Sequence, residues 1–89
     1  MATAADTTFE NPAIEAELRA RIDQVTRDHR LFSTRELGRR IDSIAGLAGL
    51  YGYGAIVDAA AALSAGLAND GRSALYGPAG HALAAALRP

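Results

Sequence analysis

Asp42 is the residue whose surroundings most suggest a chemical role, because an acidic side chain stands there among small ones. In a helix each residue turns by about 100°, so the side centred on Asp42 also carries arginines and glycines. The whole stripe consists of Arg35, Gly38, Arg39, Asp42, Ala45, Gly46, Gly49 and Tyr53. Each glycine inside a helix lowers its stability by about 1 kcal/mol relative to alanine. We therefore expect a partner protein to approach this backbone closely and bind the stripe.

The opposite side of the same segment is apolar, which predicts a helix from about Ser33 to Tyr51. The apolar residues follow a helical spacing, and they are Leu37, Ile41, Ile44, Ala48 and Tyr51. Ser33 and Glu36 form a predicted capping box, and Phe32 can pack against Leu37 as a hydrophobic staple. This side should face a core, which leaves the stripe around Asp42 toward solvent.

The segment from Asp42 to Ile56 resembles the signature of histidine-containing phosphotransfer (HPt) domains, His-x-Leu-Lys-Gly-x-Ala-x-x-x-Gly-Φ, where Φ is an aromatic or small apolar residue. The matched positions are Gly46, Ala48 and Gly52, with Ile44 in place of the leucine and Ile56 at a later apolar position. Asp42 stands where the family has its phosphorylated histidine, and Ala45 where it has a lysine. The resemblance therefore covers the scaffold of the motif without its acceptor.

The resemblance implies an all-α fold, an antiparallel up-and-down four-helix bundle with the motif on its second helix. In HPt domains the histidine takes a phosphoryl group from the aspartate of a receiver domain, or from a kinase, and passes it on. The chain is then expected to be a phosphorelay module of two-component signalling that docks the receiver domain of a response regulator, or a histidine kinase. Without the acceptor histidine it would be a pseudo-phosphotransferase, and we expect neither enzymatic activity nor a cofactor.

Two other functions stay open on the sequence. The chain could transfer phosphate through another residue, for which His29 and His81 are the candidates, but neither has an HPt-like context and each is expected at the surface or in a structural role. An acyl phosphate on Asp42 is not expected, because no second acid lies one helical turn away to help hold Mg²⁺. The chain could also be a small helical domain for protein interaction or dimerisation.

Other polar and aromatic side chains are expected to have simple roles. Arg39 precedes Asp42 by three positions, so the two should pair on the helix surface and contribute about 0.3–0.5 kcal/mol. The tyrosines at positions 51, 53 and 76 are expected to be packing or rim residues rather than nucleophiles.

The first helix is predicted to begin at Asn11-Pro12, where asparagine can cap and proline fits the first turn. It should end between Asp28 and Leu31, just before the next cap. Its apolar stripe consists of Ile14, Leu18, Ile22 and Val25. We expect residues 1–10 to form a flexible tail and residues 11–89 to form a single domain.

Two more helices are predicted after the central one. The third begins near Gly54 or Ala55 and ends at the turn-forming residues 69–71. The fourth lies between 72 and 87, and Gly77-Pro78 either kinks it or delays its start to Pro78. Their apolar positions are Ile56, Ala60, Leu63 and Leu67, then Leu75, Ala79, Leu83 and Leu87.

The composition argues against several classes of partner and site. With a formal net charge of −1 over 89 residues, the chain lacks the basic surface that nucleic-acid binding usually needs. No apolar run reaches the roughly 20 residues of a membrane span. Cysteine is absent, which excludes disulfides and thiolate metal sites, and the two histidines are too isolated for a metal site. We therefore expect a cytoplasmic protein without nucleic acid, membrane or metal, whose oligomeric state the sequence leaves open.

Overall fold

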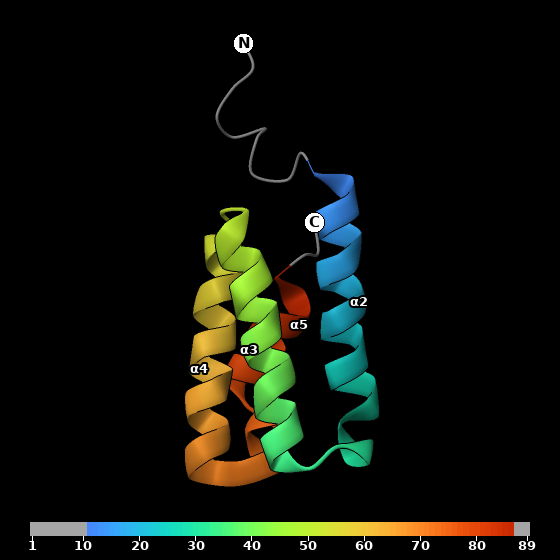
Figure 1. The fold of residues 1–89 in the computed structure, drawn as a ribbon. Helices are drawn as coiled ribbons and strands as arrows, with labels where there is room; N and C mark the ends of the chain where they lie inside the picture. Colours follow the sequence, from blue (N-terminus) through green and yellow to red (C-terminus); the bar gives the residue numbers. More distant parts are fainter. Residues whose placement is uncertain (1–10, 87–89) are drawn as a thin grey trace.

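The computed structural model describes residues 11–86, and this part of the chain is a bundle of four α-helices with two short 3₁₀ segments (Figure 1). The elements in chain order are α2 (Pro12–Asp28), η1 (His29–Leu31), α3 (Thr34–Leu50), α4 (Gly54–Asp70), η2 (Gly71–Tyr76) and α5 (Pro78–Ala85). In Figure 1 the chain passes from α2 to α3 at the lower end of the bundle and from α3 to α4 at the upper end. The predicted set of four helices is confirmed, while the predicted tail, residues 1–10, lies outside the described residues.

The first helix begins at its predicted cap. The Oδ1 atom of Asn11 accepts the backbone N–H of Ile14 at 3.3 Å, and Pro12 occupies the first helical position, where a missing N–H has no cost. The helix ends at Asp28 and continues into η1, within the predicted range. Its buried side chains are Leu18, Ile22 and Val25.

The second helix also begins at its predicted cap, but only half of the capping box forms. Ser33 Oγ accepts the backbone N–H of Glu36 at 3.0 Å, as the motif requires. The Glu36 carboxylate, however, lies 3.1 Å from Arg40 Nε, and the Arg40 guanidinium lies over the Phe32 ring, 4.1 Å from its centre. The prediction that the Glu36 side chain accepts a hydrogen bond from the backbone of Ser33 is wrong, because the Glu36 carboxylate pairs with Arg40 one turn later.

A glycine turn ends α3 and corrects the predicted positions of two tyrosines. Gly52 has a φ of +82°, and the N–H of Tyr53 donates to the carbonyl of Ala48 at 2.9 Å, as in a Schellman motif. The chain therefore leaves the helical path after Tyr51, so Tyr53 turns inward with 2% of its surface exposed, while Tyr51 is 49% exposed. The placement of Tyr53 in the outer stripe and of Tyr51 on the buried side was wrong.

The second half of the chain follows its predicted stop and start signals. The third helix, α4, ends at Asp70, and Gly71 has a φ of +67°, which glycine adopts without strain. The last helix, α5, begins with Pro78 at its first position, after η2. Gly77-Pro78 thus delays the helix, which was one of the two predicted outcomes. Leu87, predicted on its apolar stripe, lies outside the described residues.

All four helices contribute to one core, and this core decides which side of α3 faces outward. The largest fully buried side chains are Leu18, Val25, Leu37, Ile41, Ile44, Ile56, Leu63 and Leu83. Each of them was predicted from helical spacing. Burying one such side chain contributes about 1.5–3 kcal/mol, so rotation of α3 away from this arrangement is strongly unfavourable. Among the helices of residues 11–86, none combines the length and apolar character that crossing a bilayer requires.

An arginine in η2 holds the turn between α2 and α3. Arg72 Nη1 donates to the carbonyl oxygens of His29 and Phe32, the second at 2.9 Å. Beside it the Tyr76 hydroxyl lies 3.0 Å from His29 Nε2, and the two rings meet edge to face with centroids 5.4 Å apart. We call Arg72, Tyr76 and His29 the η1–η2 clamp, because their contacts tie these two segments together.

Replacing Arg72 by alanine should lower the free energy of unfolding by about 2 kcal/mol, because hydrogen bonds from a charged donor contribute roughly 1.5–3 kcal/mol. Urea denaturation followed by circular dichroism measures the change. Arg30→Ala is the control, since Arg30 is exposed and makes no hydrogen bond or ion pair within residues 11–86; its effect should stay within about 0.5 kcal/mol. Equal losses in the two variants would contradict a stabilising clamp.

Candidate functional site

The side of α3 opposite the core holds most of the residues predicted to bind a partner. We call this surface the α3 face, and its exposed members are Arg35, Arg39, Asp42, Gly46 and Gly49. Gly38 and Ala45 are half-buried along its edge, where Ala45 packs against the core. Tyr53 is buried and does not belong to it. The structure therefore brings together all the predicted residues except this tyrosine.

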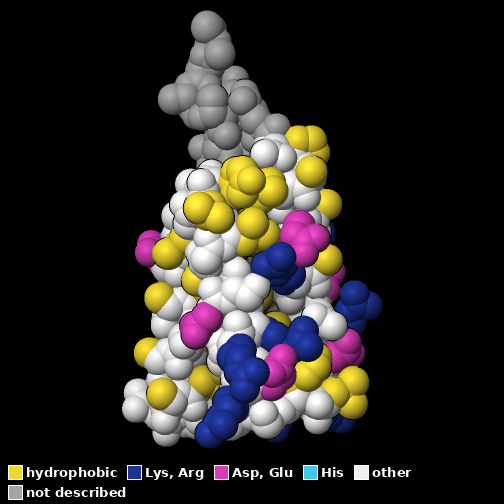
Figure 2. Space-filling model, in the orientation of Figure 1, with side chains coloured by type: hydrophobic (Ala, Val, Ile, Leu, Met, Phe, Trp, Pro, Cys, Tyr) yellow, Lys and Arg dark blue, Asp and Glu magenta, His cyan; other side chains and the backbone are white. Residues whose placement is uncertain are grey.

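Charges of both signs are mixed over this side of the molecule. Figure 2 shows basic and acidic side chains interleaved over α2 and α3, with hydrophobic side chains gathered toward the upper end. The Arg39 side chain is 69% exposed, and its Nη1 lies 3.7 Å from Glu36, so it is held only loosely. Arg35 makes no hydrogen bond or ion pair within residues 11–86. The first half of the α3 face therefore offers two accessible cations.

Asp42 turns toward α4 rather than toward the arginine before it. Its Oδ1 accepts a hydrogen bond from Ser64 Oγ at 3.4 Å, at an exposed position. The predicted pair of Asp42 with Arg39 is wrong, because Arg39 lies closest to Glu36. Helical side chains lean toward the N-terminus of their helix, so Arg39 leans toward Glu36 and away from Asp42. The carboxylate is left accessible on the α3 face.

The packing of the described chain does not require the glycines of the α3 face. A Cβ atom added to Gly38 or Gly46 would have nothing within 4 Å beyond its own local backbone. A Cβ atom on Gly49 would lie 3.9 Å from Val57 Cγ2, an ordinary contact. None of the three has a positive φ, so alanine could adopt each conformation. These glycines lower the stability of α3 without a compensating contact inside residues 11–86.

Gly38→Ala and Gly46→Ala should each raise the free energy of unfolding by about 0.5–1 kcal/mol, the ordinary advantage of alanine over glycine inside a helix. Thermal and urea denaturation of both variants measure the change. A loss of stability in either variant would show that its glycine serves the fold and that the α3 face is not open at that position.

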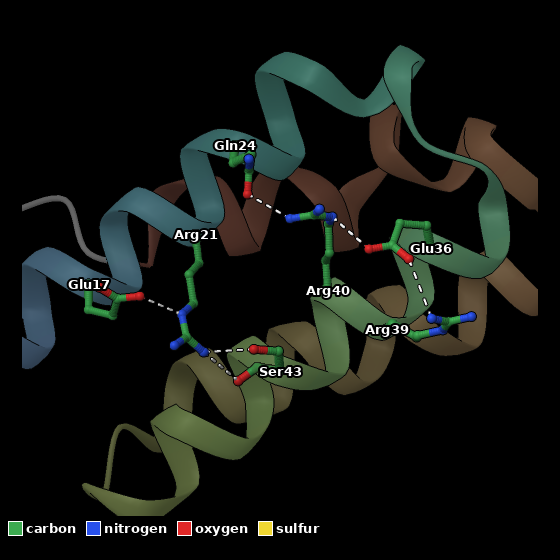
Figure 3. Close-up of a pocket in the computed structure, with 7 residues that line it drawn as sticks. All are labelled: Glu17, Arg21, Gln24, Glu36, Arg39, Arg40 and Ser43. Carbon is green, nitrogen blue, oxygen red and sulfur yellow. Dashed lines mark hydrogen bonds and ion pairs between the residues drawn. The ribbon is translucent and has the colours of Figure 1, made fainter.

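A polar groove of about 400 Å³ borders the α3 face on the side of α2 (Figure 3). It is lined by Glu17, Arg21, Gln24, Glu36, Arg39, Arg40 and Ser43. Arg21 Nε lies 2.8 Å from Glu17, and Arg21 Nη1 donates to Ser43 Oγ at 2.7 Å. Arg40 Nη1 donates to the Gln24 side chain at 2.8 Å. Because these contacts join α2 to α3, the groove is a structural contact between the two helices in which Arg21 and Arg40 already have partners.

Some residues on or beside the α3 face were not predicted from the sequence. Leu50 is 80% exposed and follows Gly46 by one helical turn, so spacing alone could have placed it on this side. Ser64 of α4 contacts Asp42, and Arg21 of α2 contacts Ser43. No spacing within one helix relates these pairs, so the sequence carried no signal for them.

Neither histidine lies on the α3 face. His29 is 8% exposed, with Nε2 against the Tyr76 hydroxyl and Nδ1 buried without a hydrogen-bond partner among residues 11–86. His81 is exposed on α5. The predicted surface or structural roles are confirmed, and the site offers no imidazole near the position of Asp42.

Within residues 11–86, no group of three or more His, Cys, Asp or Glu side chains is arranged to hold a metal ion. Comparison of the chain with protein-family models, with curated proteins and with solved structures gave no match. The α3 face combines open glycines with an exposed carboxylate.

Proposed function

We propose that this chain is an HPt-like docking module of two-component signalling, which binds the receiver domain of a response regulator or a histidine kinase without carrying the phosphoryl group itself. The observation that carries the proposal is the pair of open glycines, Gly38 and Gly46, on either side of the exposed Asp42. Glycine inside a helix is unfavourable, and a partner lying flat against the α3 face would explain its presence. In this proposal the bundle has the antiparallel up-and-down arrangement of HPt domains.

The three matched residues of the HPt-like motif have separate physical roles that fit this proposal. Ala48 is fully buried, and its small side chain lets the neighbouring helix come close. Gly52 adopts the positive φ that ends α3. Gly46 leaves the surface open. A motif that combines a packing residue, a helix stop and an open surface is suited to presenting one helix to a partner.

Because Asp42 carries a negative charge, the proposed docking needs positive charges nearby to offset it. The phosphorylation pocket of a receiver domain is acidic, so a carboxylate at the centre of the α3 face would be repelled by it. The exposed Arg35 and Arg39 can offset part of this repulsion, as can Mg²⁺ bound in the receiver. We therefore expect Mg²⁺ to strengthen the binding, and Asp42→Asn to bind more tightly than the wild type when Mg²⁺ is absent.

The test is isothermal titration calorimetry of the chain against a panel of purified receiver domains and histidine kinases, with and without Mg²⁺. We expect at least one receiver or kinase to bind saturably, and the Mg²⁺ and Asp42→Asn effects to follow the signs given above. If no member of the panel binds up to millimolar concentration, the proposal is wrong, and a general helical interaction domain becomes the better description.

A second assay separates docking from phosphotransfer. Receivers carrying radioactive phosphate are incubated with the chain, and the chain is analysed for acid-labile phosphate. We expect none, because His29 is buried in the η1–η2 clamp and Asp42 has no neighbouring acid for Mg²⁺. Phosphate on His29 or His81 would favour the alternative of a competent phosphotransfer protein.

A further inference from the structure

A second groove lies on the other side of the α3 face, between the first half of α3 and the second half of α4. It has a volume of about 390 Å³ and is lined by Thr34, Arg35, Gly38, Ser64, Leu67 and Ala68. Gly38 lines it without a side chain, and a Cβ atom added there would have nothing within 4 Å. The apolar part of the lining consists of the exposed Ala68 and of Leu67, a buried side chain with 8% of its surface exposed. In contrast to the groove beside α2, this one contains no guanidinium with a partner inside residues 11–86.

Opposite charges mark the two ends of this groove. Arg35 lines it near the start of α3, where the helix dipole adds a positive partial charge. Asp42 follows about two helical turns later and contacts Ser64 in the groove wall. At 1.5 Å per residue, the two positions are about 10 Å apart along the helix axis. The groove therefore has a positive end and an apolar middle, and the carboxylate of Asp42 borders its other end through Ser64.

We propose that this groove receives an amphipathic helix of the partner, which places a carboxylate at the Arg35 end, a basic side chain at the Asp42 end and an apolar side chain between them over Gly38. In a helix, residues seven positions apart lie on one side and about 10 Å apart, which matches the spacing of these charges. The inference rests on the proposed docking to the α3 face, and it adds the α4 residues that the partner contacts and the direction in which its charges run.

The first test uses a synthetic alanine-rich helical peptide with glutamate and arginine seven positions apart, leucine between them and a nitroxide label at the glutamate end. Titrated into the isotope-labelled chain, it should shift the amide resonances of Thr34, Gly38 and residues 64–68. The label should broaden signals near Arg35 more than those near Gly46. In a peptide with glutamate and arginine exchanged and the label unmoved, the strongest broadening should move to Gly46. No shifts in the groove, or the same broadening pattern from both peptides, would overturn the inference.

Charge reversal at the positive end gives a matched pair of variants. Arg35→Glu should weaken peptide binding roughly fivefold or more, because it replaces an attraction by a repulsion. Arg30→Glu reverses an exposed arginine that does not line the groove, so it should leave the affinity unchanged. Equal effects of the two substitutions would show that only the net charge of the chain matters, and would overturn the inference.

A second matched pair separates this inference from the proposed function. Ala68 is exposed in the groove wall of α4, whereas Ala62 is exposed on α4 away from the groove, and neither belongs to the α3 face. Ala68→Gln should weaken both peptide and receiver binding, and Ala62→Gln should not. A receiver that binds Ala68→Gln as well as wild type would overturn the groove and leave receiver docking intact. Peptide binding in the expected direction without any receiver binding would support the groove and overturn the receiver proposal.

Discussion

Gly80→Ala is expected to lower the free energy of unfolding by about 3 kcal/mol, the largest stability loss expected from a single added methyl group in this chain. Gly80 is buried at the start of α5, and an added Cβ atom would overlap the carbonyl oxygen of Leu75 and lie 2.7 Å from its carbonyl carbon. These are backbone atoms of η2, so relief requires η2 and α5 to move apart. A domain of this size has little stability to lose.

Urea denaturation of Gly80→Ala beside Gly46→Ala is the measurement, because the two variants add the same methyl group to different helices. The sign of the effect should differ: destabilising at position 80, where backbone lies in the way, and stabilising at position 46, where nothing lies within 4 Å. A Gly80→Ala variant as stable as wild type would mean that α5 does not pack against η2 as described.

Gly46→Gln is expected to weaken receiver or kinase binding about 100-fold, equivalent to about 2.8 kcal/mol. The longer side chain would stand on the α3 face beside Asp42 and hold the partner's backbone away. The chain itself should stay folded and become slightly more stable, because glutamine is a better helix former than glycine. Calorimetric titration with the receiver or kinase that binds wild type measures the loss.

The matched control for this variant is Ala20→Gln, which adds a similar side chain at an exposed position of α2. It should leave the affinity for the same receiver or kinase unchanged. If Gly46→Gln binds as tightly as Ala20→Gln, the partner does not lie on the α3 face. A general interaction or dimerisation domain, which uses another surface, would then explain the binding better.

The sequence was sufficient to predict the helices and the buried side of α3, because both depend on spacing within one helix. Leu37, Ile41, Ile44 and Ala48 are buried as the 100° rotation predicts. The same rule failed at Tyr53. The positive φ of Gly52, the residue before it, takes the chain off the helical path, so the 100° rotation no longer applies there. The helix was predicted to end at Tyr51, so the stripe should also have ended there, before the turn at Gly52.

Features that depend on two helices could not be predicted in this way. Ser64 reaches Asp42 only because of the relative position of α3 and α4 along their axes, which no single-helix pattern determines. The close approach of Gly80 to Leu75 likewise depends on how α5 folds back on η2. The partner of Arg39 was also hard to predict, because Glu36 and Asp42 each lie three positions from it. Helical side chains lean toward the N-terminus of their helix, and only this lean favours Glu36.

The η1–η2 clamp has a consequence for how the molecule can open. Arg72, in the second half of the chain, satisfies carbonyl groups in the connection that joins the first two helices. If α4 and α5 loosen, those carbonyls lose their donor, so the two halves of the bundle should come apart together rather than in sequence. Amide hydrogen exchange in α2 and α5 should therefore report one shared opening event.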